Sequence, residues 1–344
     1  MKVSIFDVAK KSGLSVVTVS RVLNNSPSVR PHNRERVIRA MQELDYHPNA
    51  SARSLARGST GIIGMMITTL NDSFLDAVVK EVNDLLEAKG YFLALSISTG
   101  EPDAYHKSLF QEDRVDGVLL LSPMYEEEYV LELKRNKIPF VLLDNQQRNP
   151  SAVSVMVDNF KGGYEATKHL IDLGHTDIAH ISGPELFLSS RERERGYREA
   201  LKDHGVQPFC VERGDFEIAS GYRIARKWLA AERLPTAIFA ADDYIALGVI
   251  DALKGAGIAV PQSVSVIGFD DQILASEFHP QLSTVRQPAE QMGKIGVELL
   301  LRSMNSALRR GMTTMLEPEL VIRESTSPRL GISEMNNRSN IKKV

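Results

Sequence analysis

The sequence predicts a small all-α head followed by an α/β body made of two doubly wound lobes with parallel sheets. The chain has 344 residues, which is enough for roughly two to three domains. Its first 45 residues place apolar side chains at helical spacing, and from residue 61 onward short apolar runs alternate with helical segments. Such alternation is typical of parallel sheets with helices on both faces.

The composition is that of a globular protein. Apolar residues make up 43% and charged residues 25%, which excludes wholesale disorder, a collagen-like chain and a coiled-coil rod. The single cysteine, Cys210, excludes a disulfide framework and a zinc site built from cysteines. No long apolar run occurs, and Asp7 stands where a signal peptide would be apolar. We therefore expect a cytoplasmic protein without membrane contact.

The charge is distributed unevenly along the chain. Residues 1–60 hold ten Lys and Arg against four Asp and Glu, whereas the remainder holds 31 against 40. A basic head on an acidic body suggests that the head meets a polyanion. A basic surface that only faces solvent is the alternative that charge alone leaves open.

Three short helices are expected in the head. Ser4 lies three residues before an acid, which is the spacing of a capping box that opens a helix. Gly13 ends this helix, and a second helix fits residues 16–23. A third fits residues 31–44, with Pro31 tolerated at its first position. Two helices joined by a tight glycine-containing turn indicate a helix-turn-helix.

The exposed face of the second helix carries residue types that recognise DNA. Arg21 can bond to two acceptors of a guanine, and Val16 and Val17 can touch thymine methyl groups. Hydroxyl and amide side chains suit phosphate oxygens, and here these are Thr18, Ser20 and Asn24. A small helical domain that carries such residues by chance is the alternative, which the basic charge disfavours.

Three stretches of the sequence form a family signature. They read IFDVA at 5–9, SVVTVSRVLN at 15–24, and YHPN followed by ARSL at 46–49 and 52–55. In these stretches, and onward to about residue 325, the chain resembles the lactose-repressor (LacI/GalR) family of bacterial transcriptional regulators. The resemblance implies a homodimer that binds a pseudo-palindromic double-stranded operator through the heads, residues 1–48. It also implies phosphate contacts by Tyr46 and Asn49.

Residues 49–60 form a short connector between the head and the body. The Ala-rich stretch between Pro48 and Gly58 is too short to be a stable helix alone in water. The resemblance implies that paired hinge helices enter the minor groove there, with Leu55 as the wedge between base steps and Ala52 and Arg53 beside it. A plain flexible linker is the alternative reading.

The body, residues 61–330, reads as two lobes that resemble the periplasmic sugar-binding proteins. One lobe is expected at 61–160 with 290–325, the other at 161–289, and the polar residues 331–344 are expected to be disordered. No leucine heptads of the kind that form tetramers occur in this tail. Expected strands are 62–68, 91–97, 115–121, 138–144, 153–157, 177–182, 236–241 and 263–269; expected helices are 73–88, 103–112, 126–136, 160–173, 190–204, 217–231, 242–256 and 288–303.

Loops that follow the strands are the expected ligand site, because ligands of such folds bind outside the carboxyl ends of the strands. These loops carry acids, an arginine and aromatic residues, which suit a polyhydroxylated ligand. The resemblance implies that Arg193, in the loop after the strand at 177–182, anchors the effector. It also implies cleft positions for the other residues of the set, which are Phe74, Asp144, Phe216, Asp242 and Asp270. Each acid alone could instead cap a helix, and Asp242 stands where several sugar binders have Asn.

Enzyme readings find little support. The chain has no G-x-S-x-G elbow and no phosphate-binding G-x-x-x-x-G-K-[ST] loop. We expect no catalytic residues, no cofactor and no metal. A sugar-binding or sugar-modifying enzyme is the rival class, and the head argues against it because a catalyst has no need of a helix-turn-helix.

The sequence thus predicts a repressor of carbohydrate-utilisation genes whose effector, a sugar or sugar phosphate, binds between the lobes. A regulator of the same fold that responds to a purine or to a phosphorylated carrier protein is the alternative.

Overall fold

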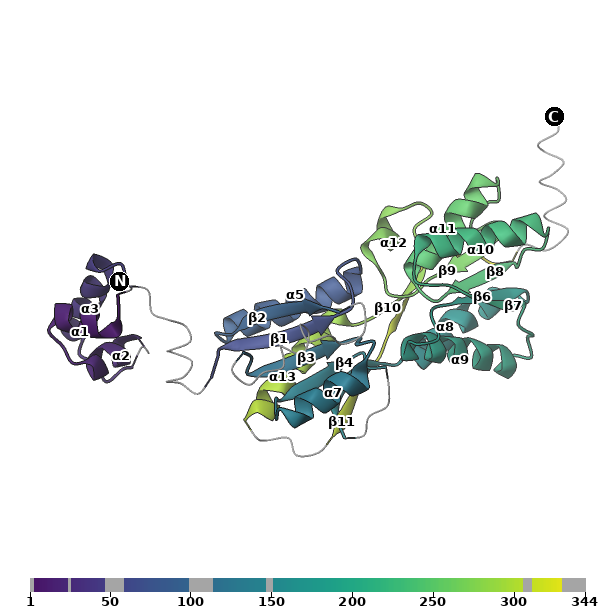
Figure 1. The fold of residues 1–344 in the computed structure, drawn as a ribbon. Helices are drawn as coiled ribbons and strands as arrows, with labels where there is room; N and C mark the ends of the chain where they lie inside the picture. Colours follow the sequence, from purple (N-terminus) through teal and green to yellow (C-terminus); the bar gives the residue numbers. More distant parts are fainter. Residues whose placement is uncertain are drawn as a thin grey trace. The chain divides into compact units, whose positions relative to one another are not determined.

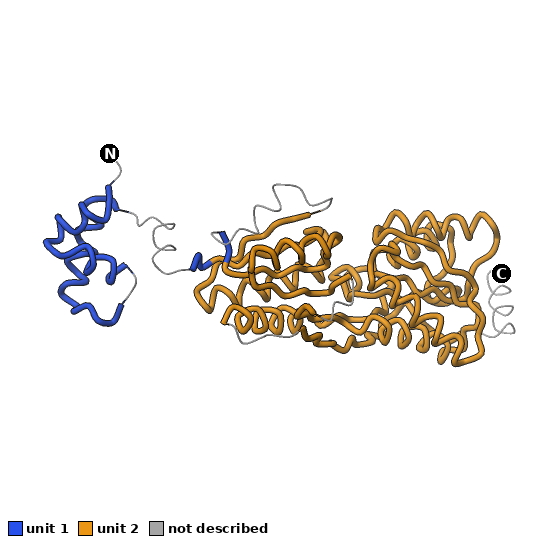
Figure 2. The backbone as a smooth tube through the Cα atoms, turned by 60° about the horizontal axis from the view of Figure 1, so that its bottom comes forward, with its two compact units in different colours: residues 1–61, 113–115 blue, residues 62–112, 116–344 orange. Residues whose placement is uncertain are grey.

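The computed structural model describes residues 3–23, 26–46, 59–98, 114–146, 151–305 and 311–329. The chain divides into two compact units, one of residues 1–61 with 113–115 and one of residues 62–112 with 116–344 (Figure 2). None of the helices in the described ranges is long and apolar enough to span a membrane.

The head consists of the three predicted helices: α1 (Ile5–Ser12), α2 (Val16–Leu23) and α3 (Pro31–Glu43). The Asp7 carboxylate accepts hydrogen bonds from the backbone N and the Oγ of Ser4, at 2.9 and 2.7 Å. Gly13 ends α1 at a φ of +64°, a left-handed conformation that glycine adopts without strain. The helices enclose a small core of Val8, Ala9, Val19, Val22, Val37 and Ala40.

The first lobe contains a six-stranded parallel sheet in the order β11-β5-β4-β3-β1-β2. Its strands are β1 (Ile62–Ile67), β2 (Phe92–Ile97), β3 (Gly117–Leu121), β4 (Phe140–Leu143), β5 (Val153–Val157) and β11 (Met312–Leu316). Three helices accompany it: α5 (Ser73–Ala88), α7 (Glu126–Arg135) and α13 (Ala289–Met304) (Figure 1).

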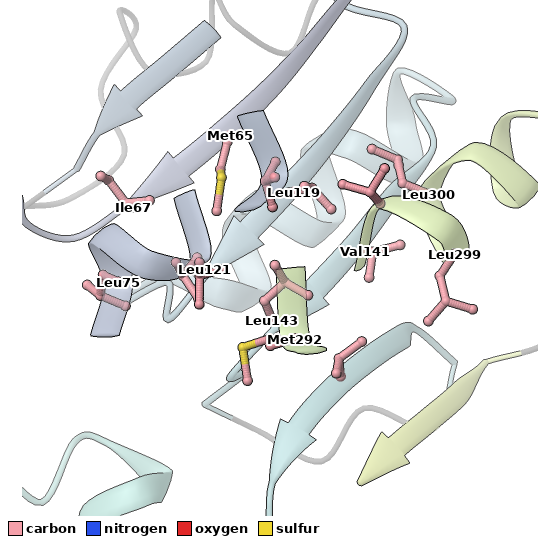
Figure 3. Close-up of a cluster of buried hydrophobic side chains, with 14 of the residues drawn as sticks. Met65, Ile67, Leu75, Leu119, Leu121, Val141, Leu143, Met292, Leu299 and Leu300 are labelled. Carbon is pink, nitrogen blue, oxygen red and sulfur yellow. The ribbon is translucent and has the colours of Figure 1, made fainter. Parts of the chain in front are cut away.

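The core of the first lobe lies between the sheet and the helices α5 and α13. Alternate residues of β1, β3 and β4, such as Met65, Leu121 and Leu143, meet Leu75 of α5 and Met292 of α13 (Figure 3). The residues between them, such as Leu120 and Leu142, are also buried. Strands β1, β3 and β4 are therefore covered on both faces, which explains why they read as continuous apolar runs.

The second lobe contains a four-stranded parallel sheet in the order β7-β6-β8-β9. Its strands are β6 (Ile178–Ser182), β7 (Cys210–Arg213), β8 (Ala237–Ala240) and β9 (Ser265–Ile267). Its helices are α8 (Asn159–Asp172), α9 (Leu188–Asp203), α10 (Ile218–Ala230), α11 (Asp243–Gly255) and α12 (Ile273–Glu277). Short antiparallel strands β10 (Thr284–Arg286) and β12 (Glu319–Val321) pair with each other.

Helices α8 and α9 pack unusually closely through one glycine from each. A Cβ on Gly163 would lie 2.4 Å from the backbone oxygen of Arg193, and a Cβ on Gly196 would lie 2.2 Å from that of Phe160. Both distances are far below a normal contact, so only glycine fits at these positions. The close packing fixes the part of α9 that carries Arg193.

The assignment of 290–325 to the first lobe is wrong for its last part. After β11 the chain returns to the second lobe, where Leu320 of β12 packs against the core around Phe269. The Ser325 hydroxyl then donates to the backbone oxygen of Val266 at 2.6 Å. The chain therefore crosses between the lobes after β5, after β10 and after β11.

The other predicted elements of the body correspond to observed ones, apart from the helix at 103–112, which lies outside the described residues. The sequence did not predict β7, β10, β11, β12 or α12. These elements are at most five residues long, and most lack a continuous apolar run.

Candidate functional site: an interlobe cleft and an exposed helix of the head

A cleft of about 670 Å³ lies between the two lobes. It is lined by residues that follow strands of both sheets, which is the position that parallel α/β folds offer to a ligand. All six residues that the sequence proposed for the effector line this cleft: Phe74 and Asp144 from the first lobe, and Arg193, Phe216, Asp242 and Asp270 from the second.

Arg193 is the most firmly held side chain of the cleft. It lies within α9, so its predicted position in a loop before the helix is wrong: α9 begins at Leu188. Its Nε donates to Asn159 Oδ1 at 2.8 Å and its Nη1 to the backbone oxygen of Ala241 at 2.6 Å. Its guanidinium also lies 3.7 Å from the centroid of the Phe269 ring. The side chain thus joins α8, β8 and the end of β9 while it faces the cleft.

Asp270 completes a buried charge pair with Arg193. Its Oδ1 lies 3.2 Å from Arg193 Nη2 and accepts a hydrogen bond from Gln287 Nε2 at 2.6 Å. Burial raises the pKa of Asp270 to about 7, although the charge of Arg193 acts in the opposite direction. The backbone of Asp270 has a φ of +106°, which is rare for any residue but glycine. Such strain is typical of functional sites.

Asp242 is both a helix cap and part of the cleft wall. Its Oδ1 accepts from the backbone N of Ile245 at 2.8 Å, so the capping alternative holds for this residue. It is buried, and burial together with the charge of Asp270 raises its pKa well above the usual range. Burial therefore makes the charged form of Asp242 less favourable than it would be at a cap exposed to solvent.

Asp144 is held without capping a helix. Its Oδ2 accepts a hydrogen bond from Ser122 Oγ at 2.6 Å, and its backbone has a φ of +48°. Burial raises the pKa of this carboxyl as well, against the opposing effect of the Ser122 bond. The three acids of the predicted set therefore all lie in surroundings that penalise their charge.

Aromatic faces enter the cleft from both lobes. Phe74 stands at the start of α5, and Phe216 stands before α10, where its ring centroid lies 5.7 Å from that of Phe187. The sequence missed Ser122, Phe187, Tyr244 and Gln287, which also line the cleft. Ser122 follows β3 directly, so the strand-end rule could have found it; Gln287 lies on a crossover and gave no such signal.

Two glutamines connect the lobes at the rim of the cleft. Gln272 of the second lobe accepts from the backbone N and the Oγ of Ser73 at 2.9 and 2.5 Å, and its Nε2 donates to Asp72 Oδ1 at 3.2 Å. Gln146 of the first lobe accepts from the backbone N of Leu188 at 3.0 Å. These bonds depend on the angle between the lobes, so a ligand that changed this angle would have to break or remake them.

Neutralising Asp242 should stabilise the ligand-free protein at neutral and alkaline pH. Because the folded-state pKa is raised, the folded protein binds more protons than the unfolded chain above about pH 4, and stability falls as pH rises. Asp242→Asn keeps a capping side chain but cannot ionise. We expect it to unfold like the wild type near pH 4 and to be more stable than the wild type at pH 8.

Urea denaturation at several pH values measures this difference. Asp251→Asn, which removes an exposed acid from the same helix α11, is the matched control and should show no pH-dependent gain. Equal gains at pH 4 and pH 8 would contradict the account.

The head presents part of the predicted DNA-reading face to solvent. Val17 is 59% exposed and Arg21 is exposed, whereas Val16 and Ser20 are half-buried. Thr18 lies 2.9 Å from the Oγ of Ser15 at the start of α2. Of the remaining residues predicted to contact DNA, Tyr46 packs partly against the head core, and five lie outside the described residues: Asn24, Asn49, Ala52, Arg53 and Leu55.

Replacing Arg21 with alanine should relax the sequence specificity of the head. Arg21 is the one long donor on the exposed face of α2, and a bidentate contact to guanine contributes about 1–3 kcal/mol. We expect this loss for the preferred duplex and an altered preference at one base pair of each half-site, measured by selection from a random duplex library. An equal loss on all sequences would identify Arg21 as a phosphate contact instead.

Comparisons with known proteins match both parts of the chain. Residues 4–49 match the model of bacterial regulatory proteins of the lacI family, and residues 167–326 match that of a periplasmic binding protein-like domain. The HTH-type transcriptional repressor PurR of Aliivibrio fischeri is 36% identical over 334 residues, which covers 95% of this chain and 99% of that protein.

Solved structures agree with the sequence comparisons. The Lac repressor dimer bound to operator and the anti-inducer ONPF superposes with a TM-score of 0.86 at 29% identity, covering 95% of this chain and all of that chain. The complex of the transcriptional regulator CelR with cellobiose gives a TM-score of 0.72 at 31% identity, covering 94% of this chain and 100% of that chain.

Proposed function

Because the chain belongs to the LacI family of bacterial regulatory proteins, we propose that its operator binding is switched by a small molecule held between the lobes. Its relatives are transcriptional repressors, so the chain is a DNA-binding repressor rather than an enzyme. The observation that carries the proposal is the cleft itself, in which residues from loops and helices of both lobes converge. Hinge closure of two lobes is an established way to transmit binding to a distant module.

The repressor acts as a homodimer in this proposal. A dimer presents two heads to the two half-sites of a pseudo-palindromic operator, and the similar Lac repressor is a dimer on its operator. Phosphate contacts by Thr18, Ser20 and Tyr46 would set the register, while Val16, Val17 and Arg21 would read base edges. Binding to chromosomal DNA would place the protein in the cytoplasm, as the sequence led us to expect.

The effector is a small ring compound rich in hydrogen-bond donors. The rings of Phe74 and Phe216 can cover a flat or puckered ring, and the carboxylates of the cleft offer acceptors. Relatives named PurR favour the purine alternative over the carbohydrate effector expected from the sequence. A neutral sugar stays as the second candidate because the similar CelR structure contains cellobiose.

A two-stage experiment tests this function. A thermal-shift screen of the full chain with purine bases, nucleosides, monosaccharides and disaccharides identifies compounds that bind, because a ligand of the folded state raises the melting temperature. Operator binding is then measured with and without each compound. A compound that raises the melting temperature and changes operator affinity supports the proposal; compounds that bind in the cleft without any effect on operator binding would contradict it.

A further inference from the structure

The cleft carries far more acidic than basic side chains. Of the described residues that line it, one is a cation, Arg193, and six are acids: Asp72, Asp144, Asp215, Glu217, Asp242 and Asp270. The acids come from both lobes, so closing the lobes would bring them nearer to one another. Without a compensating charge, closure would be opposed by repulsion.

Arg193, the one cation among the described residues of the cleft, already forms an ion pair with Asp270. Its guanidinium also donates hydrogen bonds to Asn159 and to the backbone oxygen of Ala241. In the described part of the chain, Asp242 and Asp144 form no ion pair; their bonds come from a backbone amide and from a serine hydroxyl. Among the described residues, Arg193 acts on these two carboxyls only through its charge and forms an ion pair with neither of them.

The acids share one electrostatic environment. The charges of Asp72 and Asp144 add to the effect of burial and raise the pKa of Asp270. The charges of Asp270 and Asp72 likewise help to raise the pKa of Asp242. A cation placed among them would therefore interact with several carboxylates at once, which desolvated surroundings strengthen.

A neutral acceptor in the same wall also lacks a donor. Gln287 is 6% exposed, and its Nε2 donates a hydrogen bond to Asp270. Its Oε1 has no hydrogen-bond partner among the described residues. A buried acceptor without a donor costs free energy until a ligand or water supplies one. The unpaired Oε1 of Gln287 is an observation separate from the charges of the cleft. It also favours a ligand that donates hydrogen bonds.

We infer that the effector carries a protonated nitrogen on its ring, recognised by Asp242 together with Asp144 and the free oxygen of Gln287. This inference rests on the proposed function and narrows the chemistry of its ligand. A protonated amine supplies several donors and a positive charge, whereas a sugar phosphate would add negative charge to an acidic cleft.

Matched pairs of ligands test the inference on the full-length protein by calorimetry. Glucosamine is compared with glucose, and 1-methyladenosine, a purine nucleoside protonated at neutral pH, is compared with adenosine. We expect at least one charged member to bind about tenfold or more tightly than its neutral partner, the effect of one hydrogen bond to a charged group. The pair that shows the preference identifies the ring as sugar or purine.

The variant Asp242→Asn then tests whether Asp242 causes the preference for the charged ligand. We expect it to lose about tenfold or more in affinity for the charged member and little for the neutral one, with Asp251→Asn binding both like the wild type. Neutral members that bind as tightly as charged ones, an unchanged charge preference in Asp242→Asn, or no binding of either cationic probe would each overturn the inference. A neutral compound that binds and changes operator affinity would overturn the inference of a charged effector, but it would support the proposed function.

Discussion

Replacing Arg193 with alanine should lower the free energy of unfolding by about 3–5 kcal/mol, the usual cost of breaking a buried ion pair from one side. The variant would leave Asp270 buried without its cation and would remove the bonds to Asn159 and to the Ala241 backbone. It should also abolish the response to effector, since the same side chain faces the cleft. Urea denaturation measures the first effect and ligand titration the second.

Two variants separate the structural role of Arg193 from its role in binding. Arg193→Lys keeps the charge but loses the planar fork, so it should retain much of the stability and still bind effector poorly. Arg195→Ala removes an exposed arginine of the same helix, paired with Glu192 at 2.8 Å, and should cost ~1 kcal/mol at most. An Arg193→Lys protein with undiminished effector affinity would show that the guanidinium fork of Arg193 is not needed to bind the effector.

Operator affinity should fall by roughly a thousandfold or more between 50 and 200 mM salt. The reason is the charge of residues 1–60, where ten basic residues stand against four acids. The structure also shows that some of this charge is used internally, because Lys11 pairs with Glu43 at 3.0 Å and Arg36 donates to the Ser12 backbone oxygen at 2.7 Å. The salt dependence should therefore reflect fewer phosphate contacts than the count of basic residues.

Fluorescence anisotropy of a labelled duplex across this salt range provides the measurement. Lys11→Gln should change the slope little, since its charge already has a partner, whereas Arg21→Ala should leave the slope unchanged if it contacts bases. An affinity that stays flat from 50 to 200 mM would show that the head does not bind DNA through phosphates.

Local signals in the sequence were sufficient for most of the fold. The helices of the head follow from the Ser4 cap, the break at Gly13 and the proline at the start of the third helix, all of which act within a few residues. The central strands of the sheets, such as β3, β4, β6 and β8, follow from runs of buried side chains that face both sides of the sheet. The short strands β10 and β12 exist because they pair with each other across 30 or more residues, which no local pattern reveals.

Residues of the site that come directly after strands could be predicted from the sequence. Residues whose position depends on contacts between the lobes could not. Asp144, Asp242 and Asp270 stand directly after strands or close to them, and the structure places them all in the cleft. The Gln272 contacts with Ser73 join residues 199 positions apart, and Gln287 reaches the cleft from a crossover. The sequence predicted two positions for Arg193, a loop after the strand at 177–182 and the helix expected at 190–204, and the structure places it in the helix, which begins at Leu188.

One titration shows whether a ligand in the cleft controls DNA binding by the head. A duplex selected from a random library is held at half-saturation by the wild-type protein at fixed salt, and a compound from the thermal-shift screen is added while anisotropy is followed. We expect a saturable change in bound duplex that is absent in Arg193→Lys, although this variant still binds the duplex without ligand. Bound duplex that stays constant in the wild type, with the compound demonstrably bound, would contradict it.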